Sequence, residues 1–256
     1  RCVEETEPSA RWLDDPAVFA VNRLPAHTDH MTVDGASGTL RQSLDGVWRA
    51  RVVPSHLDRL PMESTDEHWQ TAHIPPAFAS SRFDDAGYVD VNVPGCLETQ
   101  GLMRPQYVNI QYPWDGHEQP QAPHVPNSNL LALYRRTFDA DPRVRQALRA
   151  GERVSLTFDG AATAIYVWLN GAFVGYAEDA YTPSEFDVTD ALGEEGNTLA
   201  VACFQYSSAS WLEDQDCWRF HGLFRGVRLD VRPRVHVRDM QATADWDVAA
   251  QCGVLD

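Results

Sequence analysis

Residues 165–176 read IYVWLNGAFVGY and place an Asn-Gly pair between two runs of β-branched and aromatic residues. Asn170 and Gly171 both tolerate the positive backbone φ that a two-residue type I′ turn requires, and such a turn joins adjacent antiparallel strands. The residues on either side of the pair have high β propensity. The stretch therefore predicts a tight hairpin whose strands are residues 164–169 and 172–177.

Short apolar runs bounded by Gly, Pro, Asn or Asp recur along most of the chain outside this hairpin. One stretch predicts a helix, residues 142–150, with Asp141 in the N-cap position and Gly151 after its end. The other expected strands are residues 46–53, 69–74, 88–93, 131–138, 154–158, 184–188, 198–206 and 224–231. Many short strands with almost no helix predict an all-β sandwich, most simply a jelly roll.

The two ends of the chain depart from this pattern. Residues 1–44 are polar and interrupted by Pro, which predicts an irregular N-terminal extension with one short helix near residues 16–22. Residues 45–232 form the expected sandwich. A new alternation begins at Arg234, but residues 233–256 are too few to bury a core of their own. They predict either the start of a second domain or a segment that pairs with a partner.

The composition excludes several classes of function. The 256 residues include 37 acidic and 21 basic ones, a formal charge of −16 that disfavours nucleic acid and anionic membranes. Every basic residue is Arg, which excludes a lysine Schiff base or a P-loop lysine. The five cysteines form no CxxC pair, and no apolar run is long enough for a membrane span or a signal peptide. We therefore expect a cytoplasmic protein with free thiols.

Residues 210–222, SWLEDQDCWRFHG, place three acids between two tryptophans. Aromatic faces that stack on a sugar, beside carboxylates that accept its hydroxyl hydrogens, are typical of carbohydrate sites. Core tryptophans flanking a solvated acidic loop, or a cation site, explain the same composition. The spacing leaves open whether Glu213 and Asp216 form the carboxylate pair of a glycosidase.

Residues 95–129 lack a strand pattern and are rich in Pro and aromatic residues. Loops of this length inside compact domains are usually functional or disordered. The aromatic content favours an ordered, functional loop. Its two histidines, His117 and His124, are too far apart for the HxxxH spacing of a helical metal site, so we expect them to be structural.

A series of short motifs runs through the chain. They are residues 12–16 (WLDDP), 22–27 (NRLPAH), 43–49 (SLDGVWR), 107–113 (YVNIQYP), 158–160 (FDG), 168–171 (WLNG), 174–176 (VGY), 183–187 (PSEFD), 212–219 (LEDQDCWR) and 222–225 (GLFR). In this order they resemble the amino-terminal part of the large bacterial β-galactosidases of glycoside hydrolase family 2. The resemblance spans nearly all of the chain, and the acidic block is its most diagnostic part.

The resemblance implies a galactose-binding-domain-like jelly roll that contributes to the active site of a separate α/β barrel. The position of Asn109 would contact the substrate, and Ile110 would line the pocket. Asp216 would both contact galactose and ligate a sodium ion, since hard cations prefer carboxylate oxygens. Glu213 and Asp214 have no such role in the family and are expected to shape the loop. Residues 233–256 would start an immunoglobulin-like domain.

The same resemblance implies a retaining enzyme that hydrolyses terminal β-galactosides such as lactose and forms homo-oligomers. The catalytic glutamates, the magnesium ligands and the remaining sodium ligands would lie in the barrel. No catalytic residue is expected in this chain, which alone should be inactive and hold no ion tightly. A free-standing carbohydrate-binding module or lectin on the same jelly roll is the alternative, and a structural scaffold domain is a third hypothesis.

Overall fold

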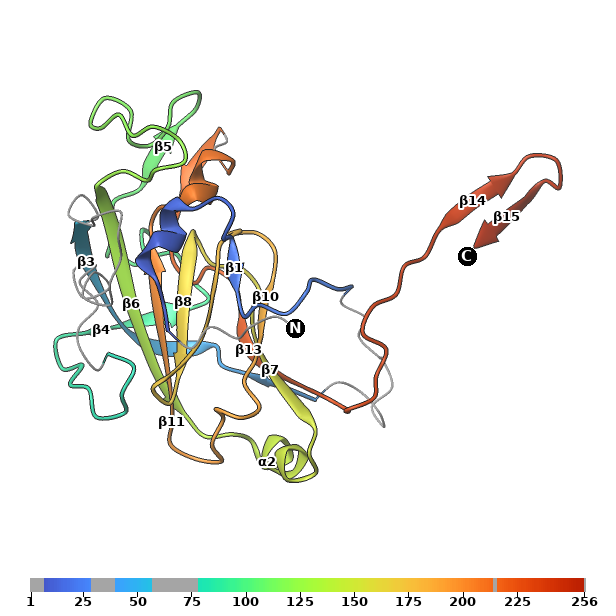
Figure 1. The fold of residues 1–256 in the computed structure, drawn as a ribbon. Coiled ribbons are helices and arrows are strands. Elements are labelled where there is room, and N and C mark those ends of the chain that lie inside the picture. The colour runs from blue at the N-terminus through green and yellow to red at the C-terminus, as the bar shows by residue number, and fades with distance from the viewer. Residues whose placement is uncertain (1–6, 29–39, 57–77, 214–215, 256) are drawn as a thin grey trace.

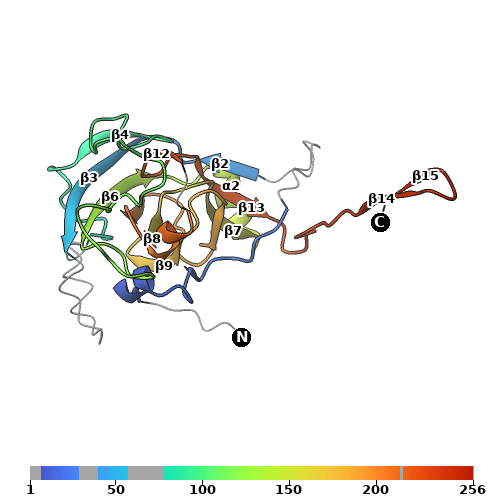
Figure 2. The ribbon, with the colours of Figure 1, turned by 90° about the horizontal axis from the view of Figure 1, so that it is seen from above.

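The computed structural model describes residues 7–28, 40–56, 78–213 and 216–255. Two antiparallel sheets pack face to face (Figures 1 and 2). The larger sheet has the order β1 (Ala20–Val21), β9 (Ala172–Ala177), β8 (Ala164–Leu169), β11 (Asn197–Phe204), β6 (Ser128–Phe138), β3 (Gly46–His56) and β4 (Val89–Val93). The smaller has the order β10 (Ser184–Asp187), β7 (Arg153–Phe158), β13 (Val227–Arg232) and β2 (Leu40–Ser43). The predicted all-β sandwich is confirmed.

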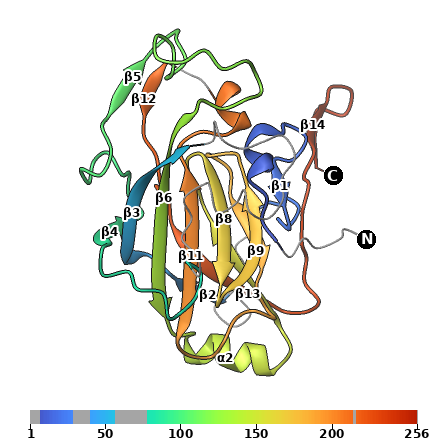
Figure 3. The same ribbon diagram turned by 60° about the vertical axis from the view of Figure 1, so that its left-hand side comes forward.

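Smaller elements complete the fold. The helix α2 (Pro142–Arg149) closes one end of the sandwich, and a two-stranded ribbon of β5 (Gln106–Val108) and β12 (Cys217–Arg219) rises from the other end (Figure 3). Two 3₁₀ helices are η1 (Ala10–Asp14) and η3 (Ser208–Trp211). After β13 the chain leaves the sandwich and forms the hairpin β14 (Ala244–Asp247) and β15 (Cys252–Leu255), which projects from the body (Figure 1).

The expected Asn-Gly hairpin is confirmed at both strand boundaries. Asn170 and Gly171 adopt positive φ angles of 54° and 89° between β8 and β9. The Asn170 side chain also fastens the turn to its neighbours: its amide group donates to Ala191 O at 2.9 Å, and its carbonyl accepts from Thr198 N at 2.8 Å. Asparagine therefore serves the turn twice, through its backbone and through its side chain.

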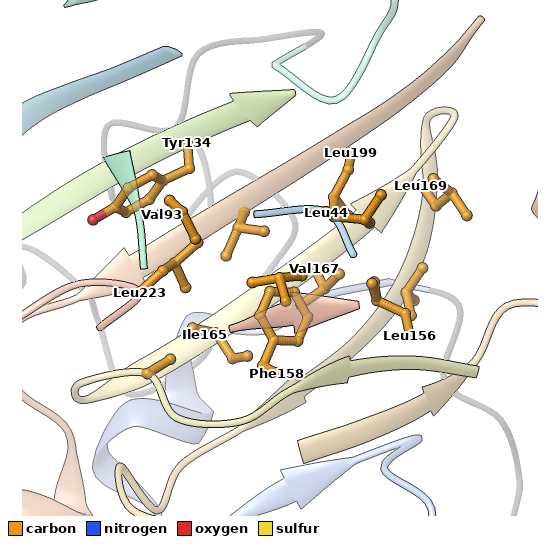
Figure 4. Packing of buried hydrophobic residues seen from close by; sticks show 14 of the residues in the cluster. Leu44, Val93, Tyr134, Leu156, Phe158, Ile165, Val167, Leu169, Leu199 and Leu223 are labelled. Atoms are coloured by element: carbon orange, nitrogen blue, oxygen red, sulfur yellow. The ribbon is translucent and has the colours of Figure 1, made fainter. Parts of the chain in front are cut away.

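The core between the two sheets is filled by alternate residues of their strands. Ile165 and Val167 of β8 point toward Leu156 and Phe158 of β7 (Figure 4). Side chains on successive strand residues point to opposite faces, so the intervening residues of β8 face away from this core. They are nevertheless buried, because β8 is covered on both faces.

A second core covers the outer face of the larger sheet, where Tyr166, Trp168 and Phe204 lie buried. The N-terminal extension supplies part of the cover. Leu13 of η1 is buried in this cluster, and the Trp12 ring stacks on Tyr166 with centroids 5.9 Å apart and an interplanar angle of 8°. The extension is therefore an integral layer of the fold, as its position beside β8 and β9 in Figure 2 shows.

The extension differs from its sequence-based description. No helix forms near residues 16–22, because Asp15 Oδ1 accepts a hydrogen bond from Ala17 N at 2.9 Å in a local turn, and β1 then pairs with β9. The 3₁₀ helix η1 lies earlier, and β2 pairs with β13 inside the stretch expected to be irregular. The stretch 95–129 likewise contains β5 and the start of β6, so its prediction as strand-free was wrong.

Three other expectations concern the strand at residues 69–74, the cysteines and membrane-spanning segments. The strand expected at residues 69–74 and Cys2 lie outside the described residues. The cysteines that the structure describes, Cys96, Cys203, Cys217 and Cys252, carry free thiols. In the described part of the chain, no helix has the length and apolar character needed to cross a bilayer.

The packing of η1 makes a stability prediction. Trp12→Ala should lower the free energy of unfolding by about 2 kcal/mol, because it removes a partly buried aromatic ring and its stacking on Tyr166. Urea denaturation of the purified chain measures this change. Trp218→Ala, at an exposed position of the ribbon, is the matched control and should cost under about 1 kcal/mol. Equal stabilities of wild type and Trp12→Ala would contradict the packing.

Candidate functional site

The ribbon of β5 and β12 brings two distant segments to one end of the sandwich (Figure 3). Val108 pairs with Cys217, so the next residues outward, Asn109 and Asp216, emerge at the same end of the ribbon. Both residues are exposed, and the side chain of Ile110 beside them is 91% exposed. All three positions singled out in the sequence are therefore exposed at or next to this end of the ribbon.

Tyr107 joins this group although the sequence analysis gave it no role of its own. Its hydroxyl donates a hydrogen bond to Asp216 Oδ1 at 2.6 Å. That bond raises the pKa of Tyr107 above its usual value, so the hydroxyl remains a donor that orients the carboxylate. The residues are 109 positions apart, and only the ribbon register reveals the contact.

Two aromatic side chains continue the exposed surface from Tyr107. Its ring lies 5.6 Å from that of Trp218, which in turn stacks on Phe220 at 6.3 Å with an angle of 11°. The residues Tyr107 and Trp218 are 52% and 56% exposed. We call Tyr107, Trp218 and Phe220 the aromatic row. Exposed ring faces beside a carboxylate can stack on a sugar while the carboxylate accepts its hydroxyl hydrogens.

Trp211, the other tryptophan of residues 210–222, has a different environment from Trp218. Trp211 packs edge-on against Tyr112 and Trp114, with centroids 4.6 and 4.9 Å away, and its Nε1 donates to His124 O at 3.0 Å. Trp211 is thus partly buried and packs against the outer core, close to its interpretation as a core residue. That interpretation is wrong for Trp218, which is exposed. Trp211 therefore anchors residues 210–222 to the Pro-rich stretch of residues 95–129.

Glu213 reaches inward from the same loop. Its Oε1 accepts a hydrogen bond from Ala180 N at 2.7 Å, and it lines a small cavity of about 50 Å³ together with Tyr181 and His221. Burial, assisted by the nearby carboxyl of Asp179, raises the pKa of Glu213 to about 7. Glu213 is therefore tied to Ala180, whereas Asp216 is tied to Tyr107. Asp214, predicted to shape the loop as well, lies outside the described residues.

Two buried carboxylates that the sequence analysis did not single out fix the segments around the site. Glu178 accepts from Ser207 Oγ at 3.0 Å and Ala209 N at 2.8 Å and so holds η3, and burial raises its pKa. Glu98 accepts from His221 N at 2.9 Å and contacts His221 Nδ1 at 2.7 Å. Glu98 and Glu178 lie in loop sequences without a recognisable motif. Only their burial in the structure distinguishes them from most other acidic residues of the chain.

The raised pKa of Glu213 predicts a pH effect on stability. A carboxyl that is protonated more readily in the folded than in the unfolded chain makes stability fall as pH rises from about 4.5 to 7. Glu213→Gln keeps an oxygen for Ala180 N and removes the charge. It should match wild type at pH 4 and be about 1 kcal/mol more stable at pH 8, a value discounted because the side chain is partly exposed.

Urea unfolding of both proteins at pH 4, 6 and 8 measures this difference. Asp90→Asn, at an exposed surface ion pair with Arg49, is the control and should show no such rise with pH. If the free energies of unfolding of wild type and Glu213→Gln differed by the same amount at all three pH values, the raised pKa of Glu213 would be contradicted.

The few ligand atoms around Asp216 limit the ability of this surface to hold a metal ion by itself. Within residues 7–28, 40–56, 78–213 and 216–255, no group of three or more His, Cys, Asp or Glu side chains could hold a metal ion. Asp216 offers one exposed carboxylate with the amide of Asn109 beside it in the ribbon register. These oxygens fit a hard cation such as sodium, but an oxygen-ligated site needs several more donors.

The chain is similar to several known proteins. The family model described as "Glycosyl hydrolases family 2, sugar binding domain" matches residues 41–233. β-Galactosidase BgaC of Bifidobacterium adolescentis is 49% identical over 99% of this chain and 24% of its own length. The β-galactosidase of Lactobacillus delbrueckii subsp. bulgaricus is 47% identical over 96% of this chain and 23% of its own length. The chain thus spans about a quarter of the length of these relatives.

Among solved structures, a β-glucuronidase from an uncultured Clostridium species superposes with a TM-score of 0.52 at 17% identity. The match covers 87% of this chain and 34% of that one. At this identity the likeness concerns the fold alone.

Proposed function

The chain belongs to the sugar-binding domain family of the family 2 glycosyl hydrolases, and from this premise we propose that it is the N-terminal sugar-binding part of a β-galactosidase. The whole protein would hydrolyse terminal β-galactosides such as lactose with retention of configuration. Two relatives named as β-galactosidases, at 49% and 47% identity over nearly the whole chain, support the reaction class.

In this proposal the outer end of the ribbon forms one wall of the galactoside pocket. Asn109 and Asp216 would bind sugar hydroxyls, Ile110 would line the pocket, and Asp216 would also ligate a sodium ion. The observation that carries the proposal is the ribbon register, which brings Asn109 and Asp216 to the same end of the ribbon, where the Tyr107 hydroxyl holds the carboxylate. An oriented carboxylate next to an amide can accept and donate hydrogen bonds to neighbouring hydroxyls.

The chemistry itself would come from a further domain of the same protein. A retaining glycosidase needs two carboxyl groups roughly 5–5.5 Å apart on either side of the scissile bond. Within the described residues, Asp216 and Glu213 are instead held by different partners, Tyr107 and Ala180. The catalytic pair, the magnesium ligands and the remaining sodium ligands would lie in that further domain.

The proposal extends to the organisation of the protein. Residues 45–232 would form the jelly-roll domain, preceded by the extension 1–44, and residues 233–256 would begin an immunoglobulin-like domain. The exposed apolar side chains of the projecting hairpin, such as Trp246 and Leu255, support the idea that further structure covers it. The whole enzyme would be a cytoplasmic homo-oligomer.

A chimera tests the proposed function. The matching segment of the Bifidobacterium adolescentis enzyme is replaced by this chain, and hydrolysis of an aryl β-galactoside is measured. We expect kcat/KM within about tenfold of the parent enzyme, because the same groups would wall the pocket. A folded, correctly assembled chimera without activity would contradict the proposal, and the chain alone should be inactive.

A free-standing carbohydrate-binding module is a second candidate, favoured by the exposed aromatic row. Titration of the isolated chain with galactose and lactose separates the two. A pocket that is only one wall should bind galactose more weakly than about 1 mM, or roughly −4 kcal/mol. Saturable binding tighter than this, lost in Trp218→Ala, would favour the module instead.

A further inference from the structure

A cavity of about 390 Å³ lies at the end of the smaller sheet where β7 begins, shortly after α2 in the chain. The helix α2 and the ribbon lie at opposite ends of the sandwich (Figure 3). The floor of the cavity is formed by the beginning of β7 and the ends of β10 and β13. The N-terminal extension forms one wall, and the segment that leaves β13 forms another. The volume is within the range of small-molecule sites in proteins.

The two walls are joined by hydrogen bonds. Asp239 Oδ1 accepts from Thr28 N at 3.0 Å and from Thr28 Oγ1 at 2.9 Å, and Arg238 Nη2 donates to Pro25 O at 3.1 Å. The Thr28 bonds lower the pKa of Asp239, which favours its charged, accepting form. The cavity is thus bounded by segments that are bound to one another.

The charge of the lining is opposite to that of the whole chain. Four guanidinium groups and two imidazoles face two carboxylates, in a chain of formal charge −16. The four arginines are Arg153, Arg232, Arg234 and Arg238. An anion that approached any average part of this surface would be repelled, so a local excess of arginine is what permits one to bind here.

Within the described residues, two of these arginines have acidic partners. Arg153 lies 2.5 Å from Asp187 Oδ2, and Arg232 lies 3.5 Å from Glu185 Oε1. Arg238 bonds a backbone carbonyl, which leaves its charge uncompensated, and Arg234 forms no ion pair within the part of the chain that the structure describes. Two guanidinium charges on one cavity wall are therefore available to an anion.

We propose that this cavity binds a small molecule that carries a phosphate group. Guanidinium groups form forked, charge-assisted hydrogen bonds to phosphate oxygens, and several of them can neutralise a dianion. His236 also lines the cavity; its Nδ1 contacts Pro233 O at 2.7 Å, which leaves its Nε2 for a further hydrogen bond. The volume of about 390 Å³ fits a small phosphate compound, whereas an acidic polypeptide would need a longer groove.

Phosphate titration of the purified 256-residue chain tests the proposal, with sodium chloride added to keep the ionic strength constant. Inorganic phosphate, galactose 6-phosphate and uncharged galactose are compared by calorimetry. We expect one saturable site for both phosphates and none for galactose at this cavity. Tighter binding of the sugar phosphate would identify a phosphate ester as the ligand class, and equal binding would identify free phosphate.

Variants locate the binding. Arg234→Gln, at an exposed position, should weaken phosphate binding about tenfold, the value of one charge-assisted hydrogen bond. The control Arg149→Gln removes an exposed arginine of α2 that pairs with Glu194, and should leave phosphate binding unchanged. Near-ultraviolet circular dichroism checks that both variants remain folded.

Three results would overturn the proposal. The first is the absence of saturation below about 10 mM phosphate, an affinity too weak for a built site. The second is an equal loss in Arg234→Gln and Arg149→Gln, which would reflect the general field of the protein. The third is binding of a polyglutamate peptide without binding of phosphate, which would assign the surface to an acidic polypeptide.

Discussion

Gly222→Ala should lower the free energy of unfolding by about 3–5 kcal/mol, the combined cost of a strained backbone and an overpacked core. Gly222 has a φ of 102°, a region that favours glycine. A Cβ there would collide with the Tyr134 hydroxyl and lie 3.0 Å from Leu97 Cγ. The backbone cannot move aside freely, because Gly222 exchanges two hydrogen bonds of 3.0 Å with Ala162.

Gly171→Ala is the matched control for this substitution. Gly171 also has a positive φ, 89°, but a Cβ there would meet no atom within 4 Å. It therefore reports backbone strain alone, which we expect to cost about 1 kcal/mol. Urea unfolding of both variants separates the cost of backbone strain from the cost of the Cβ collision. Equal losses of unfolding free energy would show that Tyr134 and Leu97 move aside without cost.

Asp216→Asn, introduced into the chimera described above, should lower kcat/KM for an aryl β-galactoside by about 10- to 100-fold. Asparagine keeps an oxygen for the Tyr107 hydroxyl, so the ribbon is retained and the loss reports the missing charge. Hydrogen bonds to charged groups contribute about 1.5–3 kcal/mol. If the carboxylate also ligates sodium, the dependence of the rate on sodium concentration should weaken in the same variant.

Glu213→Gln provides the comparison within the same loop. It also removes one carboxylate, but from a side chain that bonds Ala180 N and not Tyr107. We expect a loss of no more than about threefold in the chimera, since amide oxygen replaces carboxylate oxygen at that bond. Equal losses from the two substitutions would mean that the wrong acid has been assigned to the sugar.

Strands with local signals were predictable from the sequence, and strands defined by distant partners were not. The β8–β9 hairpin is confirmed residue by residue, because Asn170 and Gly171 determine the turn within a few positions. By contrast, β1 has two residues and β2 has four, and their partners are β9 and β13. Segments so short carry no periodicity that could be recognised.

The candidate site, too, could be predicted only in part from the sequence. Asn109, Ile110 and Asp216 could be named from the resemblance to a family, but their adjacency depends on the pairing of Val108 with Cys217. The role of Tyr107 follows from that register alone. The different environments of Trp211 and Trp218 likewise depend on which loop each one meets, a property of tertiary structure.

The N-terminal extension also affects how the protein is made. Ala20 of β1 pairs with Ala177 of β9, so the extension leaves the ribosome 157 residues before its binding surface exists. At 5–20 residues per second, roughly 8–30 s separate the two events. During that interval Trp12 and Leu13 have no sheet to cover, and they can add their layer only after β8 and β9 have been synthesised. The extension is thus translated well before it can dock, and during this interval a chaperone that shields apolar segments would protect the nascent chain.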